Sequence, residues 1–161
     1  FHQCEVCGIA LHQIGPAAED VHPGAWRHVP PAAIIPCGLG RGDRAINVLG
    51  IATGMSRRGL SHVLSNPDLA GRFVTTQVAD DHPSKPHPSM VLQAMAESGA
   101  ARGVMIGDTT FDMQMGRAAG LKTIGVCWGY HSKRALRARA DRTVADYAQL
   151  VPEVQNLWGE I

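Results

Sequence analysis

Long apolar runs, internal repeats and a strong net charge are all missing from this 161-residue sequence. A helix that spans a membrane needs about 20 mostly apolar residues, and no such run or basic, apolar leader is present, so we expect no membrane partner. The formal net charge of +1 gives no electrostatic reason to expect a nucleic-acid partner. Cysteine is also scarce, with four in the chain, and we expect free thiols in a cytoplasmic protein.

The remaining composition is ordinary for a globular protein. It is 45% hydrophobic and 18% charged, and the length suffices for one hydrophobic core. A basic cluster follows Tyr130 on a predicted helix, and we interpret it as a solvated helix face. Its members are Lys133, Arg134, Arg137, Arg139 and Arg142.

From Ala45 onward, apolar runs of strand length alternate with segments of helical length. Turn and cap residues such as Asn66-Pro67 and Ser98-Gly99 separate them. This alternation predicts a three-layer α/β fold with a parallel, Rossmann-like sheet and right-handed crossovers. The predicted strands are 45–52, 72–78, 103–106, 121–126 and 142–144, and the predicted helices are 56–65, 88–97, 111–119, 131–140 and 147–157.

Two carboxylates, Asp108 and Asp112, follow the apolar run 103–106 where a strand should end. Mg²⁺ prefers oxygen ligands and usually takes one or two carboxylates beside water and phosphate oxygens. In open α/β sheets the ligand crevice lies beyond the carboxyl ends of the strands. The spacing therefore indicates a magnesium site. The alternative is structural: Asp108 would cap the next helix, and Asp112 would add a favourable charge to its first turn.

Two further polar groups stand at predicted strand ends. The strand 45–52 runs into Thr53 and Gly54, where a hydroxyl and free N–H groups ahead of a helix could cradle a phosphate. Lys85 lies in a stiff loop between prolines. The alternatives are that Thr53 is an ordinary helix N-cap and that Lys85 is a solvated surface lysine.

Thr53, Lys85 and the Gly107-Asp108 to Asp112 stretch, in this order, resemble the motifs of the haloacid dehalogenase-like (HAD) hydrolases, in particular the phosphoglycolate phosphatase-like members. The resemblance covers about residues 45–157 and includes 118–121 and 125–130. It implies a HAD-type fold and an Mg²⁺-dependent phosphatase for a small phosphorylated metabolite, as a monomer or homodimer.

The resemblance also implies a role for each matching residue. Thr53 and Gly54 would bind the phosphoryl group, and Lys85 would neutralise the charge of phosphate and nucleophile. Asp108 would hold Mg²⁺ directly, and Asp112 would act through water or through hydrogen bonds behind it. Thr53, Lys85 and Asp108 are thus the expected catalytic residues, because phosphoryl transfer depends on positioning and charge stabilisation.

One part of the family pattern is absent. HAD phosphatases open with a strand that ends in Asp-x-Asp-Gly-Thr and carries the nucleophile, followed by a helical cap. Residues 1–44 contain neither, and their only acids are Glu5, Glu19, Asp20 and Asp43. We therefore expect 1–44 to be a non-family, irregular segment, 45–161 to be a partial HAD-like core, and the chain to show little turnover. A non-catalytic phosphate- or cation-binding module is the alternative.

The missing first strand would leave a gap in the centre of the sheet with unpaired edges. The apolar run 32–37 could fill this gap, but Pro36 lacks the N–H that a central strand uses. We expect a core that is weakly stable or that depends on an unusual substitute strand.

Residues 1–44 also hold a rival metal site. Cysteine and histidine side chains of this segment could bind Zn²⁺ through sulfur and nitrogen, although no second pair at zinc-site spacing follows the first. The candidate ligands are Cys4, Cys7, His12, His22, His28 and Cys37.

A reading-frame shift or a truncated gene would explain why residues 1–44 depart from the family pattern. We expect translation of the upstream DNA in all three frames to reveal an Asp-x-Asp-Gly-Thr string in another frame. Several hundred bases without that string would refute the explanation.

Overall fold

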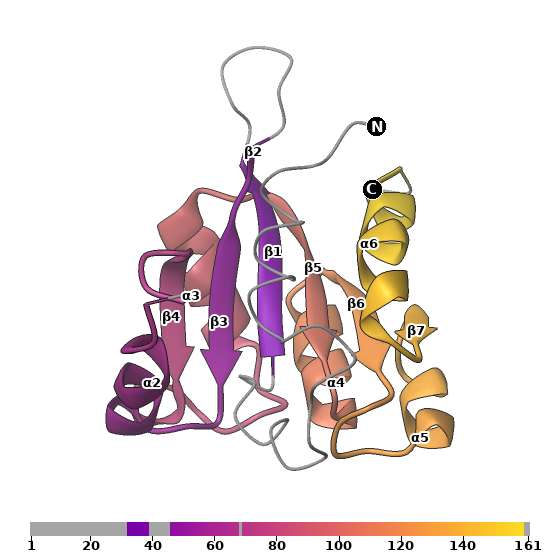
Figure 1. Cartoon of the computed structure of the whole chain (residues 1–161), viewed down its shortest axis with the longest axis horizontal. Coiled ribbons are helices and arrows are strands. Elements are labelled where there is room, and N and C mark those ends of the chain that lie inside the picture. The colour runs from indigo at the N-terminus through magenta and orange to yellow at the C-terminus, as the bar shows by residue number, and fades with distance from the viewer. Residues whose placement is uncertain (1–31, 39–45, 68, 160–161) are drawn as a thin grey trace.

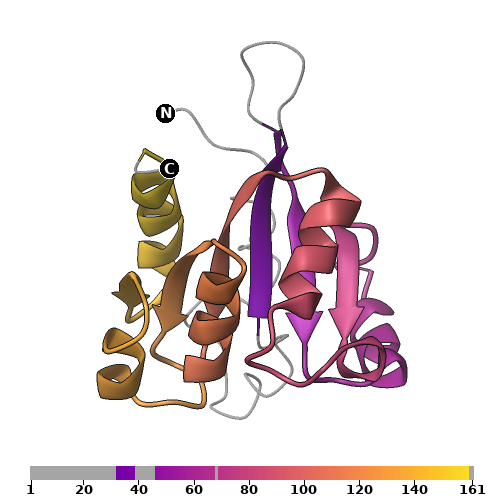
Figure 2. The ribbon, with the colours of Figure 1, turned by 180° about the vertical axis from the view of Figure 1, so that it is seen from behind.

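The computed structural model describes residues 32–38, 46–67 and 69–159. Within them, seven strands form one sheet with helices on both faces (Figures 1 and 2). The strands lie in the order β4-β3-β1-β5-β6-β7, and β2 pairs with β1. The strands are β1 (Ala32–Gly38), β2 (Ile46–Asn47), β3 (Leu49–Thr53), β4 (Phe73–Val78), β5 (Arg102–Gly107), β6 (Lys122–Val126) and β7 (Arg142–Val144).

The helices follow the strands in alternation, as the sequence predicts. Between β4 and α3 lies a short 3-10 turn, η2 (Ala79–Asp81), and η3 (Tyr147–Gln149) precedes the last helix. None of the described helices is both long and apolar enough to cross a lipid bilayer. The helices are α2 (Arg57–Leu64), α3 (Ser89–Ser98), α4 (Thr110–Ala118), α5 (Lys133–Arg137) and α6 (Leu150–Gly159).

The predicted three-layer α/β fold with its parallel strands is confirmed. β3 pairs with β4, β5 with β6, and β6 with β7, all in parallel. Three elements differ clearly from the prediction. The predicted strand 45–52 is divided into β2 and β3, α5 is shorter than the predicted 131–140, and the predicted helix 147–157 begins with a 3-10 turn. A 3-10 turn at the start of an α-helix is common and cannot be told apart by hydrophobic periodicity.

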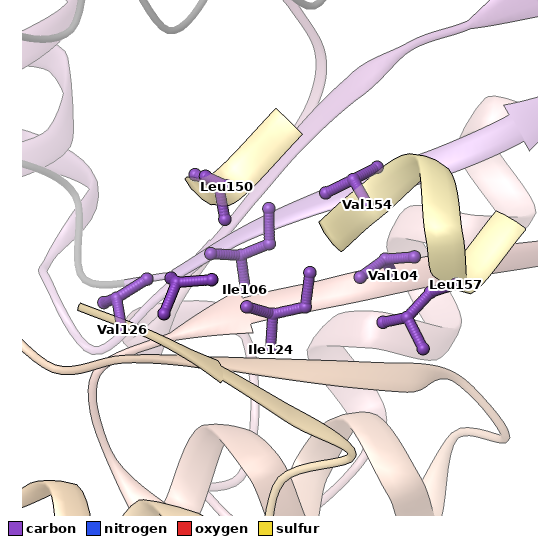
Figure 3. Close-up of a cluster of buried hydrophobic side chains, with 8 residues drawn as sticks. Val104, Ile106, Ile124, Val126, Leu150, Val154 and Leu157 are labelled. Atoms are coloured by element: carbon purple, nitrogen blue, oxygen red, sulfur yellow. The ribbon is translucent and has the colours of Figure 1, made fainter. Parts of the chain in front are cut away.

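Alternate residues of each strand pack on opposite faces of the sheet. In β3, Ile51 packs with Leu60 of α2 on one face, whereas Ala52 belongs to the cluster under α3 and α4 on the other. Figure 2 shows α3 and α4 together on this second face. α6 covers the β5–β6–β7 end of the first face, where its apolar side chains meet those of the strands (Figure 3). This cluster contains Val104, Ile106, Ile124, Val126, Val144, Leu150, Val154 and Leu157.

The central position between β3 and β5 is filled by β1, which is antiparallel to both. The prediction of an irregular segment through residue 44 is therefore wrong for 32–38, and an unusual substitute strand takes the place of the usual first strand. On the side of β3 and β2, Pro36 stands between the residues of β1 that pair with β3, Ala33 and Ile34, and those that pair with β2, which begin at Cys37, so it takes part in neither of these ladders. Toward β5, Pro36 pairs opposite Gly103.

The direction of β1 decides which of its ends lies at the carboxyl edge of the parallel strands. Ala32, the first residue of β1, pairs with Gly107, the last residue of β5. A parallel strand would instead bring its last residue to this edge. The three residues that precede Ala32 in the sequence are Val29, Pro30 and Pro31, and none of them carries a carboxylate.

Replacing Leu157 with Ala tests the α6 cluster of Figure 3. Leu157 has no exposed surface, so Leu157→Ala should lower the free energy of unfolding by about 2–5 kcal/mol through lost burial and a residual cavity. Leu92→Ala in α3 is the matched control, because Leu92 is 49% exposed and should change stability by about 0.5 kcal/mol or less. Urea denaturation measures both; equal losses would contradict the packing described here.

Candidate functional site

The predicted site residues meet at the carboxyl edge of the sheet, on both sides of β1. Thr53 is the last residue of β3, and Asp108 follows directly after β5. Lys85 stands in the loop between η2 and α3, and Asp112 lies in the first turn of α4. Parallel strands bring their carboxyl ends to one edge, which is why segments distant in sequence converge here.

An ion pair joins the two halves of this edge. The ammonium Nζ of Lys85 donates to Asp112 Oδ1 at 2.6 Å and to the carbonyl oxygen of Ala52 at 3.1 Å. Its side chain is 14% exposed and that of Asp112 is 1% exposed. Lys85 is therefore not a solvated surface lysine: it bridges the residue before Thr53 to the first turn of α4.

The other oxygen of Asp112 is engaged by the start of α4. Thr109 donates to Asp112 Oδ2 from its backbone N at 3.0 Å and from its hydroxyl at 2.7 Å. The N–H of Asp112 donates back to Thr109 Oγ1 at 3.2 Å, which completes a capping box. The helix cap is thus Thr109 and not Asp108, so the capping alternative for Asp108 is wrong.

Two glycines allow the carboxylates to approach the strand ends. A Cβ built on Gly107 would lie 2.4 Å from Asp112 Cβ, and one on Gly129 would lie 2.1 Å from Asp108 Cβ. Both distances are far below van der Waals contact. Any larger residue at either position would displace a carboxylate of the site.

Asp108 is held by the loop after β6 but keeps one oxygen unpaired. The backbone N–H of Tyr130 donates to Asp108 Oδ2 at 2.7 Å, and the N–H of His131 donates to the carbonyl oxygen of Asp108 at 3.1 Å. Asp108 Oδ1 is buried and has no hydrogen-bond partner in the part of the chain that the structure describes. A buried anionic oxygen without a donor is costly unless a cation or proton compensates it.

This arrangement fits a magnesium ion held by few protein ligands. No group of three His, Cys, Asp or Glu side chains that could hold a metal occurs among residues 32–38, 46–67 and 69–159. Mg²⁺ does not need such a cage, because water and substrate phosphate oxygens complete its coordination. Asp108 Oδ1 is available as a direct ligand, whereas both oxygens of Asp112 are already occupied by Lys85 and Thr109.

Thr53 has a hydroxyl that is aimed by its own backbone turn. The N–H of Met55 donates to Thr53 Oγ1 at 3.2 Å, so the hydroxyl proton remains for another acceptor. The residue that caps α2 is Ser56, which accepts from the N–H of Gly59, so the N-cap alternative for Thr53 is wrong. A Cβ on Gly54 would meet nothing within 4 Å, which leaves open space beside its backbone.

Sequence reasoning missed several residues that build the site. The Thr-x-x-Asp spacing of Thr109 and Asp112 is a recognisable capping signature and could have identified the cap. Nothing local in the sequence points to His131, whose Nδ1 accepts from the N–H of Thr110 at 2.9 Å. One of the predicted zinc ligands, Cys37, is a residue of β1. The others lie outside the described residues: Cys4, Cys7, His12, His22 and His28.

Comparison with known proteins finds a family that resembles this chain. The family model for haloacid dehalogenase-like hydrolases matches residues 44–126, just over half of the chain. The chain is 46% identical over 67 residues to "Probable phosphatase IndB" of Dickeya dadantii, which is 40% of this chain and 29% of that protein. It is 36% identical over 91 residues to pyrophosphatase PpaX of Bacillus pumilus, which is 55% of this chain and 42% of that protein.

The fold has counterparts among solved structures. A predicted phosphoglycolate phosphatase from Haemophilus somnus superposes with a TM-score of 0.58 at 19% identity. The match covers 65% of this chain and 48% of that one. The chain thus spans less than half the length of each of these three proteins.

The Lys85–Asp112 pair should contribute more to stability than an exposed pair of the same type. Asp112→Asn leaves the Lys85 ammonium without its counter-charge and should cost about 3–5 kcal/mol in the free energy of unfolding. Asp81→Asn is the matched control, because the Arg57–Asp81 pair is 47% and 51% exposed and should be worth about 1 kcal/mol or less. Denaturant unfolding of both variants measures the contrast.

A double variant separates the loss of attraction from the stranded charge. Lys85→Met combined with Asp112→Asn should recover part of the loss, because no uncompensated ammonium remains. Strictly additive losses would contradict direct pairing of the two side chains.

Proposed function

The chain belongs to the haloacid dehalogenase-like hydrolase family, and on this premise we propose that it carries the phosphate- and Mg²⁺-binding half of a phosphatase site. One observation carries the proposal: the buried Lys85–Asp112 pair stands beside Asp108, whose Oδ1 is buried without a donor. The names of the relatives IndB and PpaX support a phosphatase. The proposed substrate is a small phosphate monoester of the cytoplasm, as in phosphoglycolate phosphatase-like enzymes.

The charges of Asp108, Asp112 and Lys85 favour a bound cation, and donors beside them favour a bound phosphate. Two carboxylates and one ammonium leave one negative charge in excess at this edge, which favours a bound cation. Lys85 Nζ and the Thr53 hydroxyl are the donors that a phosphoryl group would meet. A lysine about 4 Å from a phosphoryl oxygen contributes up to ~4 kcal/mol at an effective dielectric constant of about 20, before desolvation.

Each residue has a definite task in this proposal. Thr53 and the N–H of Gly54 orient the phosphoryl group, and Lys85 balances its charge. Asp108 holds Mg²⁺ through Oδ1, and Asp112 fixes Lys85 rather than touching the metal. Mg²⁺ bound at Asp108 would supply a Lewis acid for the phosphoryl oxygens.

The nucleophile is the missing part, so we propose that the 161-residue chain itself turns over slowly or not at all. No Asp-x-Asp-Gly-Thr string occurs in residues 1–44, and the antiparallel β1 has its first residue at the site edge. The same observation favours the alternative of a module that binds phosphate or cation without chemistry. Loss of a covalent nucleophile in another hydrolase class lowers the rate roughly 10⁶-fold, which sets the scale.

An assay with p-nitrophenyl phosphate and Mg²⁺ tests the proposed lack of turnover. We expect a rate close to that of the buffer, because the sequence lacks the Asp-x-Asp-Gly-Thr string that would supply the attacking carboxylate. Robust hydrolysis that disappears in Asp108→Asn would refute slow turnover and establish a working phosphatase.

Calorimetric titration with Mg²⁺ and with inorganic phosphate tests the two binding subsites. Asp108→Asn should abolish Mg²⁺ binding, and Lys85→Met should weaken phosphate binding by roughly 10²-fold, given a charged hydrogen bond worth about 2–3 kcal/mol. The control for Asp108→Asn is Asp146→Asn, since Asp146 caps η3, and the control for Lys85→Met is Lys122→Met in β6. If the unaltered chain binds neither ion, the proposed site is wrong.

A further inference from the structure

A chain of polar side chains lies behind the loop that carries Lys85. Glu97 Oε2 accepts from the hydroxyl of Thr75 at 2.5 Å and from Gln77 Nε2 at 2.7 Å. His82 then joins Gln77 to Ser89: its Nε2 lies 2.8 Å from Gln77 Oε1, and its Nδ1 lies 2.8 Å from Ser89 Oγ. The chain therefore runs from the end of α3, through β4, to the start of α3.

The direction of these hydrogen bonds follows from the chemistry of the side chains. Thr75 and Gln93 donate to Glu97 and hold the pKa of that carboxyl below its usual value, so this end is an ionised acceptor. The amide nitrogen of Gln77 is the donor to Glu97, which leaves Gln77 Oε1 as an acceptor toward His82. His82 must then carry a proton on Nε2. A leucine in place of His82 would offer Gln77 Oε1 no such donor, whereas the side-chain amide of a glutamine at position 82 would.

The bridge formed by His82 closes the loop at its base. His82 and Ser89 stand at the two ends of the segment that contains Lys85, and their contact ties these ends together. Inside the segment, the N–H of His87 donates to the carbonyl oxygen of Ser84 at 3.1 Å, and the N–H of Ser89 donates to His87 Nδ1 at 3.2 Å. Lys85 thus extends from a turn whose ends are both anchored.

The other side of this loop is clamped by α2. The N–H of Arg57 donates to Asp80 Oδ2 at 2.8 Å, and its guanidinium pairs with Asp81 and donates to the carbonyl oxygen of Thr76 at 3.0 Å. These hydrogen bonds are exposed to solvent. The His82 side differs, because Thr75 and Gln77 are each only 4% exposed, which makes a broken bond there more costly.

From these contacts we infer that His82 is a positioning residue for Lys85, which rests on the proposed function only where phosphate binding is concerned. Lys85 is a flexible side chain that must present its ammonium to both Asp112 and a phosphoryl group. The position of the ammonium can be no more precise than the position of the backbone that carries the side chain. His82 ties that backbone to β4 and α3, and it does so without touching the ligand.

Chemical labelling of lysine tests this positioning without assuming any ligand. The chain contains three lysines, Lys85, Lys122 and Lys133, so reductive methylation followed by peptide mass spectrometry resolves each rate. His82→Leu removes the hydrogen bonds to both Gln77 and Ser89, so the Lys85 rate should rise by more than about fivefold, the factor that one lost hydrogen bond of about 1 kcal/mol corresponds to. His82→Gln keeps a donor for Gln77 and should stay close to the unaltered chain.

Two further variants keep the test decisive. Ser89→Ala removes one hydrogen bond at the other end of the bridge and should raise the Lys85 rate by a smaller factor, even if His82→Leu folds poorly. Asp141→Asn is the matched control: Asp141 accepts from the N–H and hydroxyl of Thr123 at 2.8 and 2.7 Å, away from the Lys85 loop. It should leave the Lys85 rate unchanged.

The labelling results divide cleanly. A selective rise at Lys85, with Lys122 and Lys133 unchanged, supports positioning by His82. An unchanged Lys85 rate in both His82→Leu and Ser89→Ala overturns it, and so does a parallel rise at all three lysines, which would mean general loosening of the fold.

Phosphate titration then links positioning to the site. With Mg²⁺ present, His82→Leu should weaken the affinity for inorganic phosphate about fivefold while the Mg²⁺ affinity stays the same, and His82→Gln should restore the phosphate affinity. Equal phosphate affinities for the Leu and Gln variants and the unaltered chain would overturn the link. If the unaltered chain binds no phosphate, the proposed function fails, and labelling alone still decides the role of His82.

Discussion

The arrangement of this edge of the sheet depends on the buried ion pair between Lys85 and Asp112. The two groups belong to segments on opposite sides of β1, and their contact of 2.6 Å holds the β4–α3 loop against the first turn of α4. A buried pair tolerates no loose partner, because an unpaired charge in a low dielectric is expensive. The surrounding contacts meet this requirement. Gly107 leaves room for Asp112, Thr109 donates to the second oxygen of Asp112, and the carbonyl oxygen of Ala52 accepts a second hydrogen bond from Lys85.

Asp108 stands next to this pair but has different hydrogen-bond partners. Asp112 has donors on both oxygens, whereas Asp108 has a donor on Oδ2 and none from the described residues on Oδ1. Two carboxylates four residues apart are therefore divided between two tasks, one fixing a lysine and one open to a cation. Helix geometry accounts for the division: Asp112 is inside the first turn and points to the backbone cap, while Asp108 precedes the helix.

β1 shows that the stability of a sheet and its chemistry are separate demands. Backbone hydrogen bonds can pair a central strand in either direction, so an antiparallel strand fills the gap between β3 and β5. The position of a catalytic residue does depend on strand direction, because only one end of the strand lies at the carboxyl edge. The family membership of the chain and its proposed lack of turnover are compatible for this reason: the sheet is completed by a strand that brings no carboxylate to the site.

From the sequence alone, local pattern predicts most of what is local. Apolar runs and cap residues predict the strands and helices from β3 to α6, and strand ends predict Thr53, Lys85, Asp108 and Asp112 as neighbours at one edge. Tertiary structure decided the rest. That Asp112 binds Lys85 at a separation of 27 residues and that Gly129 lies against Asp108 both follow from packing between distant segments. The direction of β1 is likewise undetermined by its own residues, because a strand's hydrogen-bonding groups serve parallel and antiparallel neighbours alike, and only the assembled sheet selects between them.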